Sequence, residues 1–187
     1  MSPDDVFRRL IAAFDQAGIA YMLSGSFAAA YYGATRSTQD IDFVIEATPA
    51  KLEALRQGLP QNEYYVDFVA LLEAHRQQSL FNVIDLTTGW KIDLIFRKAR
   101  HFSVEEFRRR RPVELHGVSL FVASAEDVIL SKLEWAKLGG SQRQLEDVIA
   151  IIRSRWDSLD QTYLRKWIAD LQLEAGWKSA VEKAGLS

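Results

Sequence analysis

The sequence predicts a mixed α/β (α+β) core followed by a helical C-terminal part. Short apolar runs rich in β-forming residues alternate with segments of helical spacing as far as about residue 122. Strands that alternate with helices in this way are typical of α/β folds. From Ser124 onward only helical patterns remain. We therefore expect a core domain over residues 1–122 and a helical region over residues 123–187 that packs on the core.

The composition fits a globular protein and excludes several classes of site. The chain has 187 residues, of which 48% are hydrophobic and 26% charged, and its net charge is −2. It has no cysteine, which excludes disulfides and thiol chemistry, and its three scattered histidines predict no zinc site. The acidic start of the chain does not resemble a secretory signal, and no apolar stretch is long enough to span a bilayer. We therefore expect a cytoplasmic protein that does not bind membranes.

Local signals place the elements of the core. Pro3 fits the first position of a helix, and Gly18 suits its end. Runs of β-branched and aromatic residues predict strands, and turn residues such as Thr87-Thr88-Gly89 predict a hairpin between two of them. After the first helix, the expected order is strand 20–23, helix 27–32, strand 40–45, helix 49–57, helix 69–75, strands 81–85 and 90–96, helix 103–111, and strands 113–115 and 118–122.

Helical spacing dominates the rest of the chain. Ser124 with Asp127 resembles a capping box, in which a serine and an acidic residue three positions later close the start of a helix. Gly139-Gly140 separates this helix from the next one. Further helices are expected at residues 142–153, 163–171 and 176–183.

Two carboxylates share one face of the strand expected at residues 40–45. Side chains alternate between the faces of a strand, so Asp40 and Asp42 point the same way while Ile41 and Phe43 face the apolar side. Neighbouring carboxylates repel each other unless a cation or a proton relieves them. Magnesium is a natural cation here, because it is usually held by one or two carboxylates together with substrate phosphates.

Asp93 supplies a third carboxylate from a different strand. It stands in Lys91-Ile92-Asp93-Leu94-Ile95-Phe96, where its neighbours at alternate positions are apolar. A lone aspartate is costly to bury in such a run, which favours a function for it. If this strand pairs beside the strand of Asp40 and Asp42, three carboxylates meet at one site. Such a trio can hold metal ions for an in-line phosphoryl displacement.

A small turn precedes the paired carboxylates in the chain. Ser24-Gly25-Ser26 follows one expected strand and opens a helix. Glycine lets the backbone approach a phosphate closely, and the start of a helix offers free N–H groups. The two serine hydroxyls add hydrogen-bond donors, so the turn is a candidate phosphate-binding element.

These three elements together resemble the nucleotidyltransferase superfamily. Members of that superfamily have a Gly-Ser or Gly-Gly turn, a strand with Asp-x-Asp, and a later strand with a third acidic residue. The corresponding residues here are Gly25-Ser26, Asp40-Ile41-Asp42 and Asp93. More narrowly, the chain looks like the minimal bacterial nucleotidyltransferases of the AbiEii type, which occur as toxins or toxin-associated proteins. The spacing of Gly33, Arg36 and Thr38 before Asp40 is typical of that group.

The resemblance extends into the helical part, as far as about residue 155. Lys132 on a serine-capped helix, followed by Arg143 and Asp147 on the next helix, is similar to later motifs of the same group. One position departs from the pattern, because Gln144 stands where these relatives often have an acidic residue. The departure weakens any role assigned to the segment from Arg143 to Asp147.

The resemblance implies a nucleotidyltransferase-like mixed β-sheet flanked by helices, and transfer of a nucleoside monophosphate from an NTP to an acceptor. It implies that Asp40 and Asp42 bind Mg²⁺, with Mn²⁺ as an alternative. Asp93 either completes the metal site or acts as general base toward the acceptor hydroxyl. The residues implied in nucleotide binding are Ser24, Gly25, Ser26, Arg36, Thr38 and Lys132.

A basic segment raises the question of a nucleic-acid acceptor. Arg108 to Arg111 are consecutive arginines, and Arg97, Lys98 and Arg100 follow the strand of Asp93. If both clusters face the site, they could bind an RNA acceptor such as tRNA. The alternative, which we favour, is a solvated helix end, where cations also suit the helix dipole.

Several functions remain open at this level. The acceptor can be RNA or a protein, and the resemblance suggests a toxin–antitoxin or phage-defence setting. A close alternative is an antitoxin that modifies a partner toxin with AMP. A nucleotide-binding module without catalysis is a third option, although the presence of all three carboxylates argues against loss of the site. A fourth is an interaction protein whose helical tail docks a partner. No motif encodes the base of the NTP or the oligomeric state.

Overall fold

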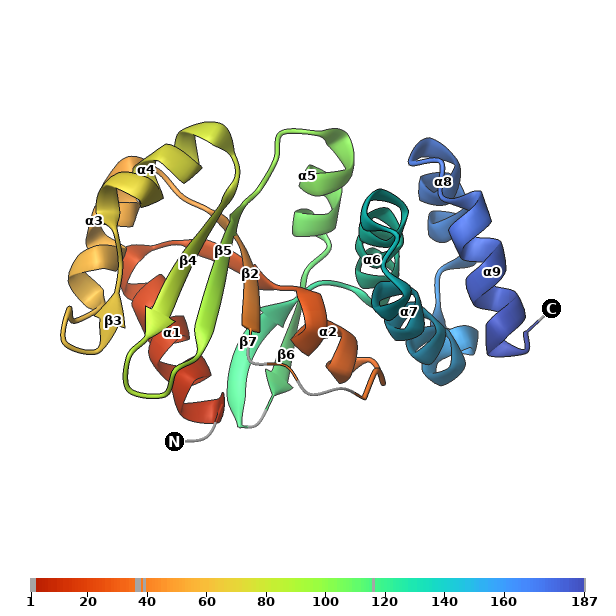
Figure 1. Ribbon diagram of the computed structural model, residues 1–187, viewed down its shortest axis with the longest axis horizontal. Coiled ribbons are helices and arrows are strands. Elements are labelled where there is room, and N and C mark those ends of the chain that lie inside the picture. The colour runs from red at the N-terminus through yellow and green to blue at the C-terminus, as the bar shows by residue number, and fades with distance from the viewer. Residues whose placement is uncertain (1–2, 36–37, 39, 116, 187) are drawn as a thin grey trace. The chain divides into compact units, whose positions relative to one another are not determined.

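The computed structural model describes residues 3–35, 38, 40–115 and 117–186. The chain forms two compact units, each made from two segments (Figure 1). The sheet unit comprises residues 1–24 and 38–122, and the helical unit comprises residues 25–37 and 123–187. Strands and helices mix in the sheet unit, whereas the described part of the helical unit contains helices alone. The predicted fold class, a mixed sheet with flanking helices and a helical C-terminal part, is confirmed.

The described strands form one mixed sheet in the order β3-β4-β5-β2-β1-β7-β6. Parallel pairing joins β2 to β5 and β1 to β7, and the other neighbours are antiparallel. The strands are β1 (Ala20–Leu23), β2 (Asp40–Glu46), β3 (Tyr64–Tyr65), β4 (Leu80–Asp85), β5 (Lys91–Phe96), β6 (Arg111–Leu115) and β7 (Val118–Val122). Both hairpins expected from the sequence, β4–β5 and β6–β7, are present.

An aromatic core covers one face of the sheet. Phe43 of β2 is fully buried and points to this face together with Tyr21 of β1. Helix α1 (Pro3–Ala17) packs against it through Phe7 and Phe14, whose ring centroids lie 6.2 and 5.2 Å from that of Phe43. Burial of these rings removes a large apolar area from water, which stabilises the unit. The opposite face of β2 is thereby left for its polar residues.

The remaining helices of the sheet unit begin at polar caps or at loop ends. They are α3 (Pro49–Gly58), α4 (Phe68–Gln77) and α5 (His101–Arg108). Thr48 caps α3, since its Oγ accepts the N–H of Lys51 at 3.4 Å, and Asp67 caps α4 in the same way. The Thr48 cap agrees with the start of the helix expected at residue 49.

The helical unit is held by packing around α6. Its helices are α2 (Gly25–Tyr31), α6 (Ala125–Gly139), α7 (Gln142–Arg155), the short 3₁₀ helix η1 (Trp156–Ser158), α8 (Gln161–Asp170) and α9 (Glu174–Ala184). Ser124 caps α6 through its Oγ, which accepts the N–H of Asp127 at 3.2 Å. Tyr163 of α8 donates from its hydroxyl to Asp127 at 2.6 Å. Within the described residues, no helix combines the length and apolar character that a bilayer crossing requires.

Several details of the expected elements differ in the structure. The helix expected at residues 103–111 ends at Arg108, and Arg111 instead begins β6. Pro112 explains this, because the residue before a proline is driven toward extended conformations and proline is tolerated in an edge strand. Helix α2 begins at Gly25, two residues earlier than expected. Strand β3 was not anticipated, because a pair of residues is too short to show a periodic pattern.

Candidate active site

Three carboxylates stand on neighbouring parallel strands. The register of β2 with β5 pairs Asp42 with Asp93 and Asp40 with Lys91. Paired residues of adjacent strands point to the same face, so Asp40, Asp42, Lys91 and Asp93 share the face opposite the aromatic core. Asp93 is buried, with 7% of its surface exposed, whereas 54% of the Asp40 side chain is exposed. Asp40, Asp42 and Asp93 therefore form an acidic patch on this face, in which Asp40 is exposed to solvent and Asp93 is buried.

A lysine bridges two of these carboxylates. The Nζ atom of Lys91 lies 3.6 Å from Oδ1 of Asp40 and 3.3 Å from Oδ2 of Asp93. Burial alone would lower the pKa of Lys91, but the Asp93 and Asp40 carboxylates outweigh it and hold the pKa above its usual value. Asn82 of β4 donates from its amide to Oδ1 of Asp93 at 2.6 Å. Both oxygens of Asp93 therefore have a polar neighbour.

The donor set fits a cation that is shared with a substrate. Among the described residues, no group of three or more His, Cys, Asp or Glu side chains is arranged to hold a metal ion. Asp40 and Asp42 nevertheless offer carboxylate oxygens, the ligands that Mg²⁺ prefers, and Mg²⁺ is commonly held by one or two carboxylates plus phosphates. The Lys91 ammonium already occupies the space between Asp40 and Asp93. The residues thus fit a magnesium ion that takes its other ligands from phosphate oxygens, and they do not form a site closed by protein ligands alone.

The turn that the sequence marked for phosphate binding is divided between the two units. Ser24 ends the first segment of the sheet unit, and its N–H donates to the carbonyl of Asp42 at 2.9 Å. Gly25 begins α2 with a φ of +60°, a conformation that glycine adopts without strain. Ser26 lies within α2 and is only 8% exposed. Ser24 is thus directly beside a candidate metal ligand through its backbone.

The two candidate residues before β2 have different outcomes. Thr38 accepts the N–H of Asp40 on its Oγ at 3.2 Å, and the same hydroxyl lies 3.3 Å from the Asp40 carbonyl. This local turn directs the chain into β2 at the residue that starts the acidic patch. Arg36 lies outside the described residues.

Lys132 belongs to a buried ion pair in the helical unit. Its Nζ atom donates to Oδ2 of Asp147 at 2.7 Å and to Oε1 of Gln144 at 2.9 Å. The side chains of Lys132 and Asp147 are only 5% and 6% exposed. Gln144, the residue that departs from the pattern of the similar family, therefore accepts a hydrogen bond from the same ammonium. This triad links α6 to α7.

The arginine run does not form a single basic face. Arg108 is exposed and pairs with Glu105 at 3.0 Å. Arg110 instead places its guanidinium over the rings of Phe107 and Phe121, 4.3 and 5.2 Å from their centroids. Arg111 continues into β6, so the side chains of the run diverge.

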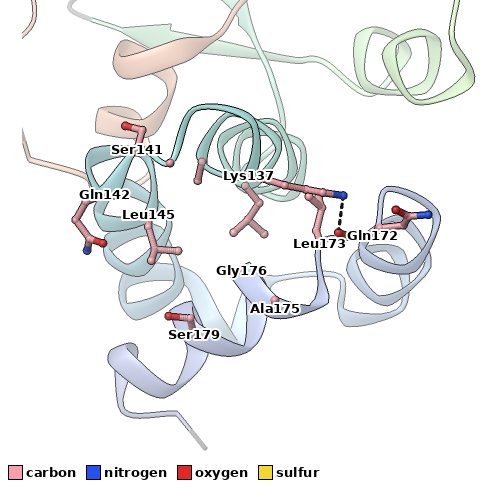
Figure 2. A pocket seen from close by; sticks show the side chains of 12 residues that line it. Lys137, Ser141, Gln142, Leu145, Gln172, Leu173, Ala175, Gly176 and Ser179 are labelled. Carbon is pink, nitrogen blue, oxygen red and sulfur yellow. Dashed lines mark hydrogen bonds between the residues drawn. The ribbon is translucent and has the colours of Figure 1, made fainter.

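A separate cavity of about 400 Å³ lies within the helical unit. Figure 2 shows it between α6, α7 and the start of α9, with the Lys137 side chain extending along one edge toward Gln172. Lys137 donates from Nζ to the carbonyl of Gln172 at 3.0 Å, and Leu133, Leu145 and Leu173 supply apolar walls. None of the residues that the sequence assigned to the nucleotide lines this cavity.

Two residues that contact the acidic patch, Lys91 and Asn82, were not identified as site residues from the sequence. Lys91 could have been found, because it stands two residues before Asp93 and therefore on the same face of the strand. Asn82 gave no signal of its own. Its contact with Asp93 depends on the β4–β5 register, which pairs these two residues across the hairpin.

Comparisons with known proteins identify the fold. Neither a protein-family model nor a curated protein sequence matches the chain. The antibiotic-resistance factor ANT(2″)-Ia has a similar structure, with a TM-score of 0.59 at 12% identity over 96% of each chain. A crystal structure of ANT(2″)-Ia in complex with adenylyl-2″-tobramycin gives 0.58 at 14% identity, covering 91% of this chain and 97% of that chain.

Two further solved structures agree. The lincosamide antibiotic adenylyltransferase LnuA, in lincomycin-bound form, matches with a TM-score of 0.54 at 12% identity over 81% of this chain and 96% of that chain. JHP933 from Helicobacter pylori matches with a TM-score of 0.52 at 17% identity over 98% of this chain and 80% of that chain. The chain therefore has a nucleotidyltransferase-like fold.

Proposed function

We propose that this protein is a magnesium-dependent nucleotidyltransferase, which moves a nucleoside monophosphate from an NTP to a hydroxyl group of an acceptor. One observation carries the proposal: Asp40, Asp42 and Asp93 share one face of two adjacent parallel strands, with Asp42 and Asp93 in register. The similarity of the fold to that of an adenylyltransferase supports it. The presence of all three carboxylates favours an enzyme over a binding module without catalysis.

In the proposed reaction the acceptor hydroxyl oxygen bonds to the α-phosphorus, and the bond from that phosphorus to the pyrophosphate oxygen breaks. Asp93 would take the hydroxyl proton, since it is the most buried of the three carboxylates and Asn82 fixes its orientation. Asp40 and Asp42 would hold Mg²⁺, which when bound neutralises the triphosphate and polarises the α-phosphate. Lys91 would have to leave Asp40 or Asp93 as the ion and the nucleotide enter.

The roles proposed for nucleotide binding have unequal support. The proposal for Ser24 is supported by its nearness to Asp42, whose carbonyl accepts the Ser24 N–H. The proposal for Gly25, Ser26, Arg36 and Thr38 rests on their spacing in the sequence. The proposal for Lys132 rests on its sequence motif, and its ammonium is held by Asp147 and Gln144. The AbiEii-type subgroup and its toxin–antitoxin setting likewise rest on sequence motifs.

Calorimetry with each of the four NTPs, with and without Mg²⁺, tests the proposal. We expect one NTP to bind in the presence of Mg²⁺ and the heat to disappear in an Asp40→Asn, Asp42→Asn double variant. Glu114→Gln, which neutralises an exposed carboxylate on β6, is the matched control and should bind normally. Binding of an NTP that is unaffected by the double variant, or no binding by a folded protein, would refute the proposed site.

A further inference from the structure

Exposed apolar side chains gather at the edge of the sheet beside the acidic patch. Tyr65 of β3, Leu80 and Ile84 are 57%, 45% and 38% exposed. All three lie on the same face of the sheet as Asp93. The register pairs Tyr65 with Ile84 and Ile84 with Lys91, and Lys91 shares the face of Asp93. We name them the apolar strip. A cluster of exposed apolar side chains on an otherwise polar surface indicates an interaction site.

The apolar strip is continuous with the candidate active site. Asn82 lies between Leu80 and Ile84 on the same face of β4, and it donates to Asp93. Ile84 pairs directly with Lys91, whose ammonium also contacts Asp93. Adjacent strands are about 4.8 Å apart. An extended segment beside β4 would therefore lie two strand spacings, about 10 Å, from β5, and only its side chains on this face would reach toward Asp93.

The strand that carries most of the strip has a partly open edge. Strand β3 pairs only with Ile84 and Asp85 of β4. Within the described residues, no strand lies on the outer side of β4 from Leu80 to Val83. Open strand edges are templates for another polypeptide, which adds a strand and packs its alternate side chains on the sheet face. Along this open stretch, Leu80 and Asn82 face the side of the sheet that carries Asp93, whereas Ile84 lies where β3 already pairs.

The charge of this surface disfavours a nucleic acid. Sites for single-stranded nucleic acids combine aromatic side chains with basic grooves that follow the phosphates. On β4 and β5, Lys91 is the only cation on this face among the described residues, and its ammonium already contacts Asp40 and Asp93. The charged groups beside Lys91 are the carboxylates of Asp40, Asp42 and Asp93, which repel phosphates. An uncharged, extended polypeptide suits the surface better.

We propose that the apolar strip and the open edge of β4 form the docking site for an extended segment of a protein, whose hydroxyl side chain is the acceptor. The assignment rests on the proposed function, because it places the acceptor beside Asp93. It narrows the acceptor to the polypeptide class and makes Leu80 and Ile84 residues that determine specificity.

Peptide binding without nucleotide tests the docking site independently of the chemistry. The probe is a fluorescein-labelled nine-residue peptide of alternating valine and threonine with a central tyrosine, followed by fluorescence anisotropy. A peptide of the same length with prolines at alternate positions, which cannot donate strand hydrogen bonds, is the control ligand. The variants are Leu80→Lys and Ile84→Lys. Val69→Lys, at a 77% exposed apolar position on α4 outside the strip, is the matched control.

We expect the wild type and Val69→Lys to bind the strand-forming peptide, and each strip variant to bind it about tenfold more weakly. The proline peptide should not bind. NTP binding, measured by calorimetry, should be the same in all four proteins. If the wild type binds no NTP, the proposed function is refuted, whereas peptide binding still tests the docking site separately. The docking site is refuted by peptide binding that ignores Leu80 and Ile84, by absence of peptide binding, or by labelled oligouridine that binds in a strip-dependent manner instead of the peptide.

Discussion

The buried ion pair of the helical unit gives the sharpest stability prediction. Asp147→Ala removes the carboxylate 2.7 Å from the Lys132 ammonium, in a pair whose side chains are only 5% and 6% exposed. Breaking a buried pair leaves an uncompensated charge and typically costs about 3–5 kcal/mol. Gln144 still accepts from the ammonium at 2.9 Å, so we expect the lower end, about 3 kcal/mol. For a chain of this length that corresponds to a fall in Tm of about 6–12 °C.

Urea unfolding followed by tryptophan fluorescence measures this cost, because Trp156, Trp167 and Trp177 all lie in the helical unit. A double variant Lys132→Met, Asp147→Leu removes both charges and should recover stability to within about 1 kcal/mol of the wild type. Glu182→Ala breaks the exposed pair with Lys178, at 3.9 Å, and should cost less than about 0.5 kcal/mol. A cost of less than about 1 kcal/mol for Asp147→Ala, or a double variant as unstable as the single one, would show that no buried charge is left uncompensated.

Three other predictions follow from particular residues. Gly33→Ala should lower the free energy of unfolding by about 2–4 kcal/mol, because the φ of Gly33 is +112° and a Cβ would lie 2.7 Å from the Ser154 Cβ. The control Gly89→Ala, at φ +76° with no atom within 4 Å of the added Cβ, should cost only about 1 kcal/mol. Equal costs for the two variants would disprove the clash at Gly33. Burial raises the pKa of Tyr21 from 10.0 to about 12, so a difference absorbance titration against Tyr21→Phe should show one tyrosine that ionises late. Since the raised pKa exists only in the folded protein, stability should fall as pH rises from 10 toward 12; a tyrosine that titrates at its usual pKa would contradict this. Lys91→Met should tighten Mg²⁺ binding about fivefold, because it removes a competing cation beside Asp40 and Asp93, whereas unchanged binding measured by calorimetry would show that the lysine does not compete.

Much of the fold could be predicted because the signals are local. Apolar periodicity and helix caps depend on residues within a few positions of each other, as at Thr48-Pro49 and Ser124, and both caps are present in the structure. The end of α5 was misplaced because two local signals compete at Arg111. The arginines favour a helix, whereas Pro112 and the pairing of Arg111 with Val122 favour a strand, and the strand prevails.

The same division applies to the candidate site. That Asp40 and Asp42 share a face could be predicted from the sequence alone, because alternation along a strand is a property of the local backbone. The pairing of Asp93 with Asp42 and the contact of Asn82 with Asp93 follow from which strands pair and in which register, and these are known from the folded structure. The sequence also could not show that Lys132 is held by Asp147 and Gln144, which requires α6 and α7 to pack together. Strand register and helix packing depend on the simultaneous burial of many side chains that are distant in the sequence, and a short motif does not contain this information.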